Sequence, residues 1–178
     1  MIGGTLDTLK ALFFDRLKKG ECMDCPVCGR LTKIYKRRLH TSIALQLIQL
    51  YRLGGASEFV HASQLIGEGV AGAGDFTKAK YWNLIEPMHV VPDSGKKSSG
   101  YWMLTLDGKQ FVEGERAIQE FALLYDDKVL EFSGRMVSID ECLGEKFDYS
   151  ALMSQPLGDL ALPSGGSATA TSVNGEPL

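Results

Sequence analysis

The sequence lacks any apolar segment approaching the length of about 20 residues that is needed to cross a bilayer. Its first residues also lack the order of a secretory signal, because Asp7, Lys10 and Asp15 interrupt the apolar positions and the basic residues follow them. We therefore expect no contact with membranes. The expected location is the cytoplasm, or the host-cell cytoplasm if the protein is viral.

Catalytic motifs are also missing. The three histidines lie in no motif typical of a general base, and the sequence contains no G-x-S-x-G elbow, Walker A loop or H-E-x-x-H helix. The glycine-rich segment GEGVAGAGD at 67–75 follows no expected strand and precedes no Lys-Ser/Thr pair. It is expected to form a turn and not a phosphate-binding loop. These absences predict that the protein is not an enzyme.

Charge of one sign does not dominate the chain, but it is unevenly distributed. The net charge of the 178 residues is −3, yet residues 1–106 hold 14 Lys/Arg against 9 Asp/Glu. Residues 107–178 hold 5 Lys/Arg against 13 Asp/Glu. Phosphate neutralisation by Lys and Arg supplies most non-specific affinity for nucleic acid. The basic front of the chain therefore favours a phosphate-rich partner.

Cysteine is sparse but clustered, which is typical of metal binding and not of a disulfide framework. Cys22, Cys25 and Cys28 are spaced C-x2-C-x2-C, and CPVCG at 25–29 has the form of a zinc knuckle. We expect a structural Zn²⁺ bound by these three cysteines and His40, with Cys142 as the alternative ligand. A redox pair, an iron–sulfur cluster and free thiols are the alternatives. His61 and His89 are weaker candidate ligands.

Apolar periodicity and turn residues predict a chain that is mainly helical. The helix over 41–53 is apolar on nearly all sides, so we expect it to be deeply buried. The segments 84–91 and 101–106 are expected to pair as a hairpin with a polar tip over 92–100. A strand is expected at 135–139. The other expected helices cover 5–19, 57–67, 76–84 and 109–133.

These elements suggest five segments along the chain. The tail is expected to be disordered because it is rich in Pro, Gly, Ser, Ala and Thr. The segments are an N-terminal helix (1–20), a zinc knuckle with a basic stretch (21–40), a central domain (41–133), a C-terminal extension (134–154) and the tail (155–178).

Two short motifs carry a family resemblance. YWNLIEP at 81–87 is similar to the end of a recognition helix that continues into a strand, and YWMLTLDGKQFVEG at 101–114 is similar to a second wing strand leading into a last helix. Residues 41–133 thus resemble a winged helix-turn-helix. The implied fold class is α+β, mainly helical, with a two-stranded wing. The turn at 67–75 is longer and richer in glycine than in that family. Residues 25–53 also loosely resemble small uncharacterised proteins of phages and mobile elements.

The winged-helix resemblance implies binding to double-stranded DNA, as in a transcriptional regulator of phage or bacterial type. Helix 76–84 would enter the major groove and pack through Phe76, Ala79 and Trp82. The basic tract over 30–38, with Tyr35 interleaved, is a second candidate phosphate-binding surface. The candidate DNA-binding residues are Thr77, Lys78, Lys80 and Tyr81 on that helix, Lys96 and Lys97 at the wing tip, and Lys33, Lys36, Arg37 and Arg38 in the tract.

Two other functional hypotheses use the same elements. The protein could be an adaptor that docks on host transcription or replication machinery through the winged helix and the acidic helix over 109–133. A homodimer through 109–133 is the further hypothesis, because it would suit a palindromic DNA site.

Overall fold

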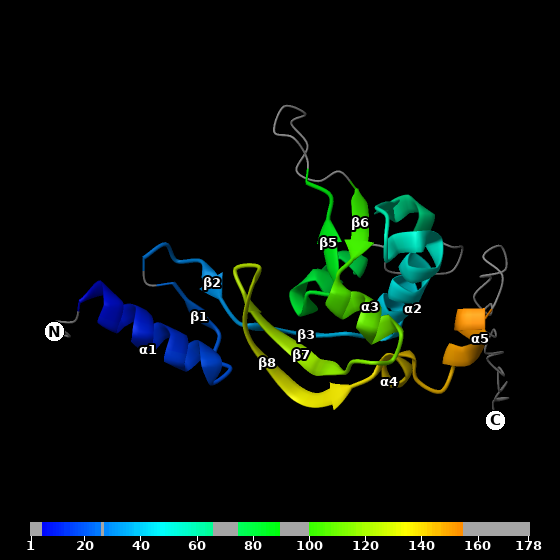
Figure 1. Ribbon diagram of the computed structural model, residues 1–178. Coiled ribbons are helices and arrows are strands. Elements are labelled where there is room, and N and C mark those ends of the chain that lie inside the picture. The colour runs from blue at the N-terminus through cyan, green and yellow to red at the C-terminus, as the bar shows by residue number, and fades with distance from the viewer. Residues whose placement is uncertain (1–4, 26, 66–74, 90–99, 155–178) are drawn as a thin grey trace, which may run out of the picture.

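The computed structural model describes residues 5–25, 27–65, 75–89 and 100–154, and the elements below lie within these ranges (Figure 1). In chain order they are α1 (Leu6–Lys18), β1 (Met23–Asp24), β2 (Leu31–Thr32), β3 (Tyr35–Arg38), α2 (Thr41–Leu50), the π-helical turn η1 (Tyr51–Gly55), β4 (Val60–His61), the 3₁₀ helices η2 (Ala62–Leu65) and η3 (Phe76–Trp82), β5 (Ile85–Pro87), β6 (Tyr101–Leu104), α3 (Leu106–Val112), β7 (Ile118–Tyr125), β8 (Lys128–Val137), α4 (Ile139–Leu143) and α5 (Tyr149–Ser154).

The core is built around α2. Every residue from Ile43 to Leu50 is buried, as the apolar pattern predicts, and the helix packs against α3, α4 and η3. Gly54, with a φ of 87°, lies inside the turn η1 that follows the helix. Residues before and after 41–133 complete this core, so the packed unit extends beyond that range on both sides; they are Leu39, Val137, Ile139, Leu143 and Leu152.

Three antiparallel sheets surround or flank this core. The predicted hairpin over 84–106 is confirmed by the pairing of Ile85 with Leu104, and β4 joins it to give the order β4-β6-β5. Its tip falls within 90–99, outside the described residues. The second sheet has the order β3-β7-β8, and β1 pairs with β2 in a small hairpin. Residues 66–74 and the tail 155–178 also lie outside the described ranges.

The prediction of a helix over 109–133 is wrong. α3 ends at Val112, Gly114 has a φ of 78°, and the chain then forms the hairpin β7–β8. Asp126 and Asp127 connect the two strands with φ values of 49° and 59°, which is the positive φ that a two-residue hairpin turn requires. The dimer hypothesis and the acidic docking helix both depended on this helix and lose their basis.

The prediction of a mainly helical winged helix-turn-helix is therefore wrong as well. Strands make up 27% of the described residues and form three sheets, so the fold is mixed α and β. Residues 57–65 form β4 and η2 in place of a helix, and 76–82 form a 3₁₀ helix. In η3 the buried residues Phe76, Ala79 and Trp82 recur at every third position, a spacing that aligns side chains on a 3₁₀ helix and that an α-helix also accommodates.

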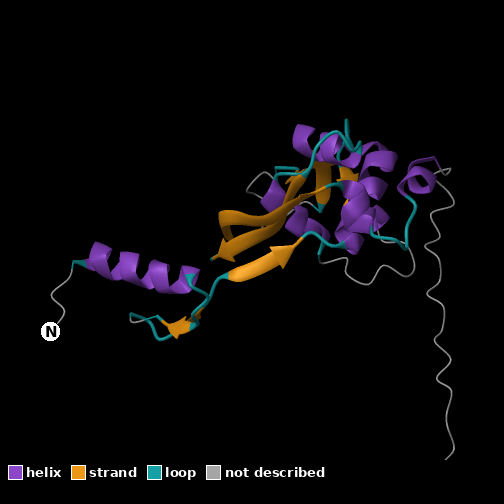
Figure 2. Ribbon diagram, turned by 90° about the horizontal axis from the view of Figure 1, so that it is seen from below, coloured by secondary structure: helices purple, strands orange, loops and turns teal. Residues whose placement is uncertain are grey.

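α1 and the β1–β2 hairpin lie to one side of the core (Figures 1 and 2). The predicted helix over 5–19 is confirmed, with the Thr5 hydroxyl accepting a hydrogen bond from the Thr8 amide at its start. Leu17 is its one buried residue, and Phe14 makes an edge-to-face contact with Tyr125 at 5.3 Å between ring centroids. None of the helices in the described ranges is long and apolar enough to span a membrane.

Candidate functional site

The CPVCG motif forms the tip of the β1–β2 hairpin. The Cys25 amide donates to the Arg30 carbonyl and the Gly29 amide donates to the Cys25 carbonyl, each at 2.8 Å, and Gly29 adopts a φ of 68°. Backbone hydrogen bonds from Val27 and Cys28, together with the Cys28 thiol, lower the pKa of Cys25. Amide groups directed at a sulfur favour the thiolate, which is the form that binds metal.

The remaining expected ligands are not gathered around this pair. Among the residues that the structure describes, no three His, Cys, Asp or Glu side chains come together closely enough to hold a metal ion. Cys22 is exposed. The His40 ring is held elsewhere, with Nδ1 at 2.8 Å from the Ser42 hydroxyl and Nε2 at 3.3 Å from Asp75 Oδ2. The structure thus brings two of the expected ligands together.

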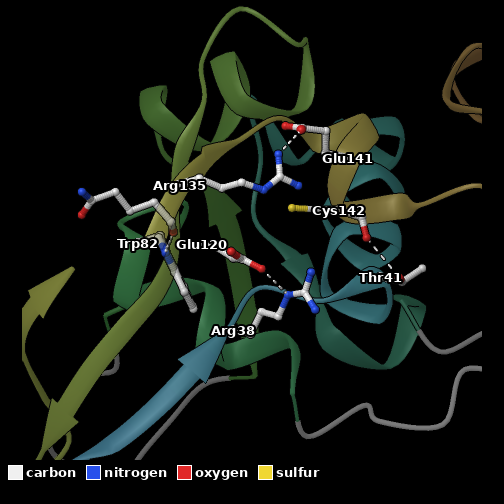
Figure 3. A network of polar contacts seen from close by, with 8 residues as sticks. Arg38, Thr41, Trp82, Glu120, Arg135, Glu141 and Cys142 are labelled. Atoms are coloured by element: carbon white, nitrogen blue, oxygen red, sulfur yellow. Dashed lines mark hydrogen bonds and ion pairs between the residues drawn. The ribbon is translucent and has the colours of Figure 1, made fainter. Parts of the chain in front are cut away.

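Cys142 lies in a different environment, at the end of the second sheet (Figure 3). It belongs to α4, where the Thr41 hydroxyl donates to its carbonyl at 3.0 Å. Burial raises the pKa of its thiol to about 11, so the neutral thiol is the stable form. The thiol is packed against the core, and this environment does not favour the thiolate that a metal would require.

The expected recognition segment has its charges paired. Lys78 forms an ion pair with Asp75, and Lys80 lies 3.0 Å from Asp127 Oδ2. The Tyr81 hydroxyl donates to the same Asp127 carboxylate. The Lys78 contact lowers the pKa of Asp75, and the Tyr81 and Lys80 contacts lower that of Asp127. Both carboxylates therefore stay ionised and neutralise the lysines. Thr77 lies within η3, and Lys96 and Lys97 fall outside the described residues.

The basic tract over 30–38 is different. Within the described ranges, no carboxylate pairs with Arg30, Lys33, Lys36 or Arg37; we call these four residues the cation strip. Lys33 Nζ lies 4.8 Å and the Arg37 guanidinium 5.4 Å from the centroid of the exposed Tyr35 ring. Lys36 Nζ lies 3.8 Å from the Phe121 ring. Successive side chains of a strand point to opposite faces, so the cations of β3 reach both faces of the sheet.

Arg38 is the exception in the tract. Its Nε lies 2.9 Å from Glu120 Oε1, on the neighbouring strand β7 (Figure 3). The same network holds Arg135, which pairs with Glu141. Arg38 therefore belongs to a neutral network beside Cys142 and is not part of the cation strip.

Two open hollows meet at Tyr35. The knuckle hollow, of about 330 Å³, is bordered by both knuckle cysteines, Arg30, Lys33, Tyr35 and Tyr125. The η3 hollow, of about 240 Å³, is bordered by Tyr35, Arg37, Lys78, Tyr81 and Leu124. Asp126 borders both. Each hollow thus combines two tyrosines with cations, and Tyr35 stands between them.

Sequence reasoning found the strip but missed the rest of its surroundings. Tyr125 and Asp126 fall within the expected helix over 109–133, and nothing in the local sequence shows that β7 pairs with β3 across 83 or more residues. The one available sign was Gly114, which interrupts the expected helix.

Comparison of the chain with protein-family models, curated proteins and solved structures gives no match.

Proposed function

We propose that this protein binds nucleic acid through the cation strip of Arg30, Lys33, Lys36 and Arg37. The observation that carries the proposal is the contrast in pairing. Three of the four strip residues are exposed and Arg37 is half-buried, and none has a carboxylate partner among the described residues, whereas Lys78 and Lys80 are paired with Asp75 and Asp127. Cations without partners are available to displace counterions from phosphates, and this displacement gives the affinity.

The geometry favours phosphate contact over base reading in a major groove. η3 is a 3₁₀ helix of seven residues whose lysines are neutralised, so we assign it no role in a groove. Arg30 directly precedes β2, Lys33 lies between β2 and β3, and Lys36 and Arg37 lie on β3, so the four cations follow one short segment of the chain. Contacts to phosphate position a nucleic acid without reading its sequence. We propose DNA as the physiological ligand and the cytoplasm as the location.

We further propose that Cys25 and Cys28 bind a structural Zn²⁺. Amide hydrogen bonds to the Cys25 sulfur support this, and so does the hairpin itself. β1 and β2 pair at only two positions, Met23 with Thr32 and Asp24 with Leu31. An isolated two-stranded hairpin is marginally stable in water, so its tip needs another source of order. A metal bound at the tip would supply that order, and the two further ligands are not in place.

The test compares two variants that remove the same charge. Lys36→Gln with Arg37→Gln removes two cations from the strip, and Lys78→Gln with Lys80→Gln removes two paired lysines. Binding of a labelled DNA of mixed sequence is measured between about 50 and 200 mM salt. The strip variant should bind about tenfold more weakly, with a salt slope that is lower by about two. The paired-lysine variant should lose less than about threefold, because each lysine already has a carboxylate partner.

Equal losses in the two variants would show that net charge alone controls binding and would contradict the assignment of the strip. Absence of binding by the unmodified protein at about 50 mM salt would contradict the proposed function itself. Melting curves of both variants provide the control for folding.

A protein-docking role is the second candidate, and the N-terminal helix favours it. Leu6, Leu9 and Leu12 in the first turns of α1 are 44–60% exposed. Exposed apolar side chains gathered on one helix are typical of a protein interface. If no nucleic acid is retained, deletion of residues 1–12 followed by a comparison of oligomeric state becomes the appropriate experiment.

A further inference from the structure

We infer that the preferred ligand of the cation strip is single-stranded nucleic acid, with bases held on either side of Tyr35. This inference rests on the proposed function and specifies its ligand. It follows from the two hollows that adjoin the strip, which the charge argument alone does not use.

Aromatic walls are the first observation. Tyr35 is 47% exposed and borders both hollows, Tyr125 borders the knuckle hollow, and Tyr81 borders the η3 hollow. A flat base can stack on an exposed tyrosine ring that borders a recess, whereas the bases of a duplex are stacked on one another and present only their edges. The hollows, at about 240 and 330 Å³, lie near or below the lower limit for sites that enclose drug-sized ligands. They suit single bases of a strand that continues beyond them.

The position of the cations is the second observation. Lys33 and Arg37 lie two residues before and two residues after Tyr35, and both lie close to its ring. Stacking of a base on an aromatic ring is stronger than an exposed cation–π contact. An incoming base therefore displaces the flexible cations from the ring, and they are then placed to contact the phosphates on either side.

Two carboxylates border the hollows and oppose an anionic ligand. Asp127 borders the η3 hollow, where Lys80 and Tyr81 hold it, and Asp126 provides a second test of the inference. Asp126 borders both hollows, and its carboxylate would repel a phosphate at the point where they meet. Asp126 has a φ of 49°, a conformation that Asn adopts as readily as Asp. Asp126→Asn therefore removes the repulsion while leaving the hairpin turn in place.

The experiment uses the full chain, a labelled oligothymidylate and a duplex of the same length, at about 50 mM salt. The single strand should bind at least about tenfold more tightly than the duplex. Tyr35→Leu keeps an apolar side chain in β3 but removes the ring, and it should weaken single-strand binding about tenfold with little change for the duplex. Tyr35→Phe keeps the ring and should bind as the unmodified protein does. Asp126→Asn should strengthen single-strand binding about threefold.

The outcomes separate this inference from the proposed function. If the unmodified protein binds neither the single strand nor the duplex, the proposed function is contradicted. Equal binding of duplex and single strand, or an equal effect of Tyr35→Leu on both, overturns the inference and leaves the proposed function standing. The inference is also overturned if polyglutamate displaces the labelled oligothymidylate as effectively as unlabelled oligothymidylate does, because the strip would then bind any polyanion.

Discussion

Two lysine-bearing segments of the chain have opposite electrostatic surroundings in the folded protein. Residues 30–37 keep four cations without carboxylate partners in the described structure, and residues 78–81 have both of their lysines paired. Both segments are equally plausible DNA-binding surfaces when only their sequences are considered. Lys78 is paired locally by Asp75, whereas Lys80 is paired by Asp127 in the hairpin turn between β7 and β8, which lies far away in the sequence.

The comparison shows that formal charge in a sequence differs from charge available to a ligand. Asp127 accepts from Lys80 and Tyr81, which are 46 or more positions away along the chain. An exposed ion pair contributes little to stability, but it removes most of the field that a phosphate would feel.

The largest effect is expected from the knuckle, which positions the first half of the strip. Cys25→Ser combined with Cys28→Ser should abolish zinc binding, because two thiolates of the site are lost. Without metal the two-pair hairpin should no longer hold Arg30 and Lys33, so single-strand affinity should fall about tenfold. Metal analysis of the purified chain measures the first effect, and oligonucleotide titration measures the second.

Cys142→Ala is the matched control for that variant. Its half-buried thiol stays protonated, with a pKa raised to about 11, so zinc content and binding should be unchanged. Zinc retained in the double cysteine variant would exclude the knuckle as the site. Zinc lost on replacing Cys142 would instead support the four-cysteine arrangement.

A single substitution in the β7–β8 turn should convert the paired segment into a basic one. Asp127→Asn removes the carboxylate that holds Lys80, and Asn tolerates the φ of 59° at this turn position. Affinity for DNA should rise about threefold, because one positive charge is released beside the η3 hollow. The measurement is the same titration at low salt.

A double-substitution cycle distinguishes release of Lys80 from a general change in net charge. Asp127→Asn should lose most of its gain when Lys80→Gln is also present. An unchanged gain in the combined variant would mean that the carboxylate acts on the ligand directly, and the account of the neutralised lysine would be wrong.

Elements with strong local patterns could be predicted from the sequence. α1 with its Thr5 cap, the buried α2 and the β5–β6 hairpin all appear where periodicity and turn residues place them. The packing set of Phe76, Ala79 and Trp82 is also confirmed. Their helix type is not, because a spacing of three is compatible with both helical forms.

The region after α3 could not be predicted in the same way. The apolar residues from Phe111 to Phe132 recur at intervals that also fit a helix, and the Asp126-Asp127 turn lacks the glycine that usually marks a tight hairpin. The part of the site that lies in one continuous segment, the cations near Tyr35, could therefore be predicted. Its other side, formed by Tyr125, Asp126 and Asp127, depends on strand pairing between β3 and β7, which local patterns do not show.

The smallest effect is expected from the hydroxyl of Tyr81 in the paired segment. Burial and the hydrogen bond to Asp127 raise the pKa of Tyr81 to about 12, against about 10 in an unfolded chain. Because the folded state favours the neutral phenol, this contribution to stability is complete below pH 10 and is lost as the pH rises toward 12. Tyr81→Phe should therefore lose less stability than the unmodified protein between pH 9 and pH 11, by about 1 kcal/mol after allowing for solvent screening. Urea unfolding at the two pH values measures the difference, and the other tyrosines cancel because both proteins contain them. Parallel loss in the two proteins would show that burial and Asp127 do not hold the Tyr81 phenol neutral, and Asp127 would then be assigned to Lys80 alone.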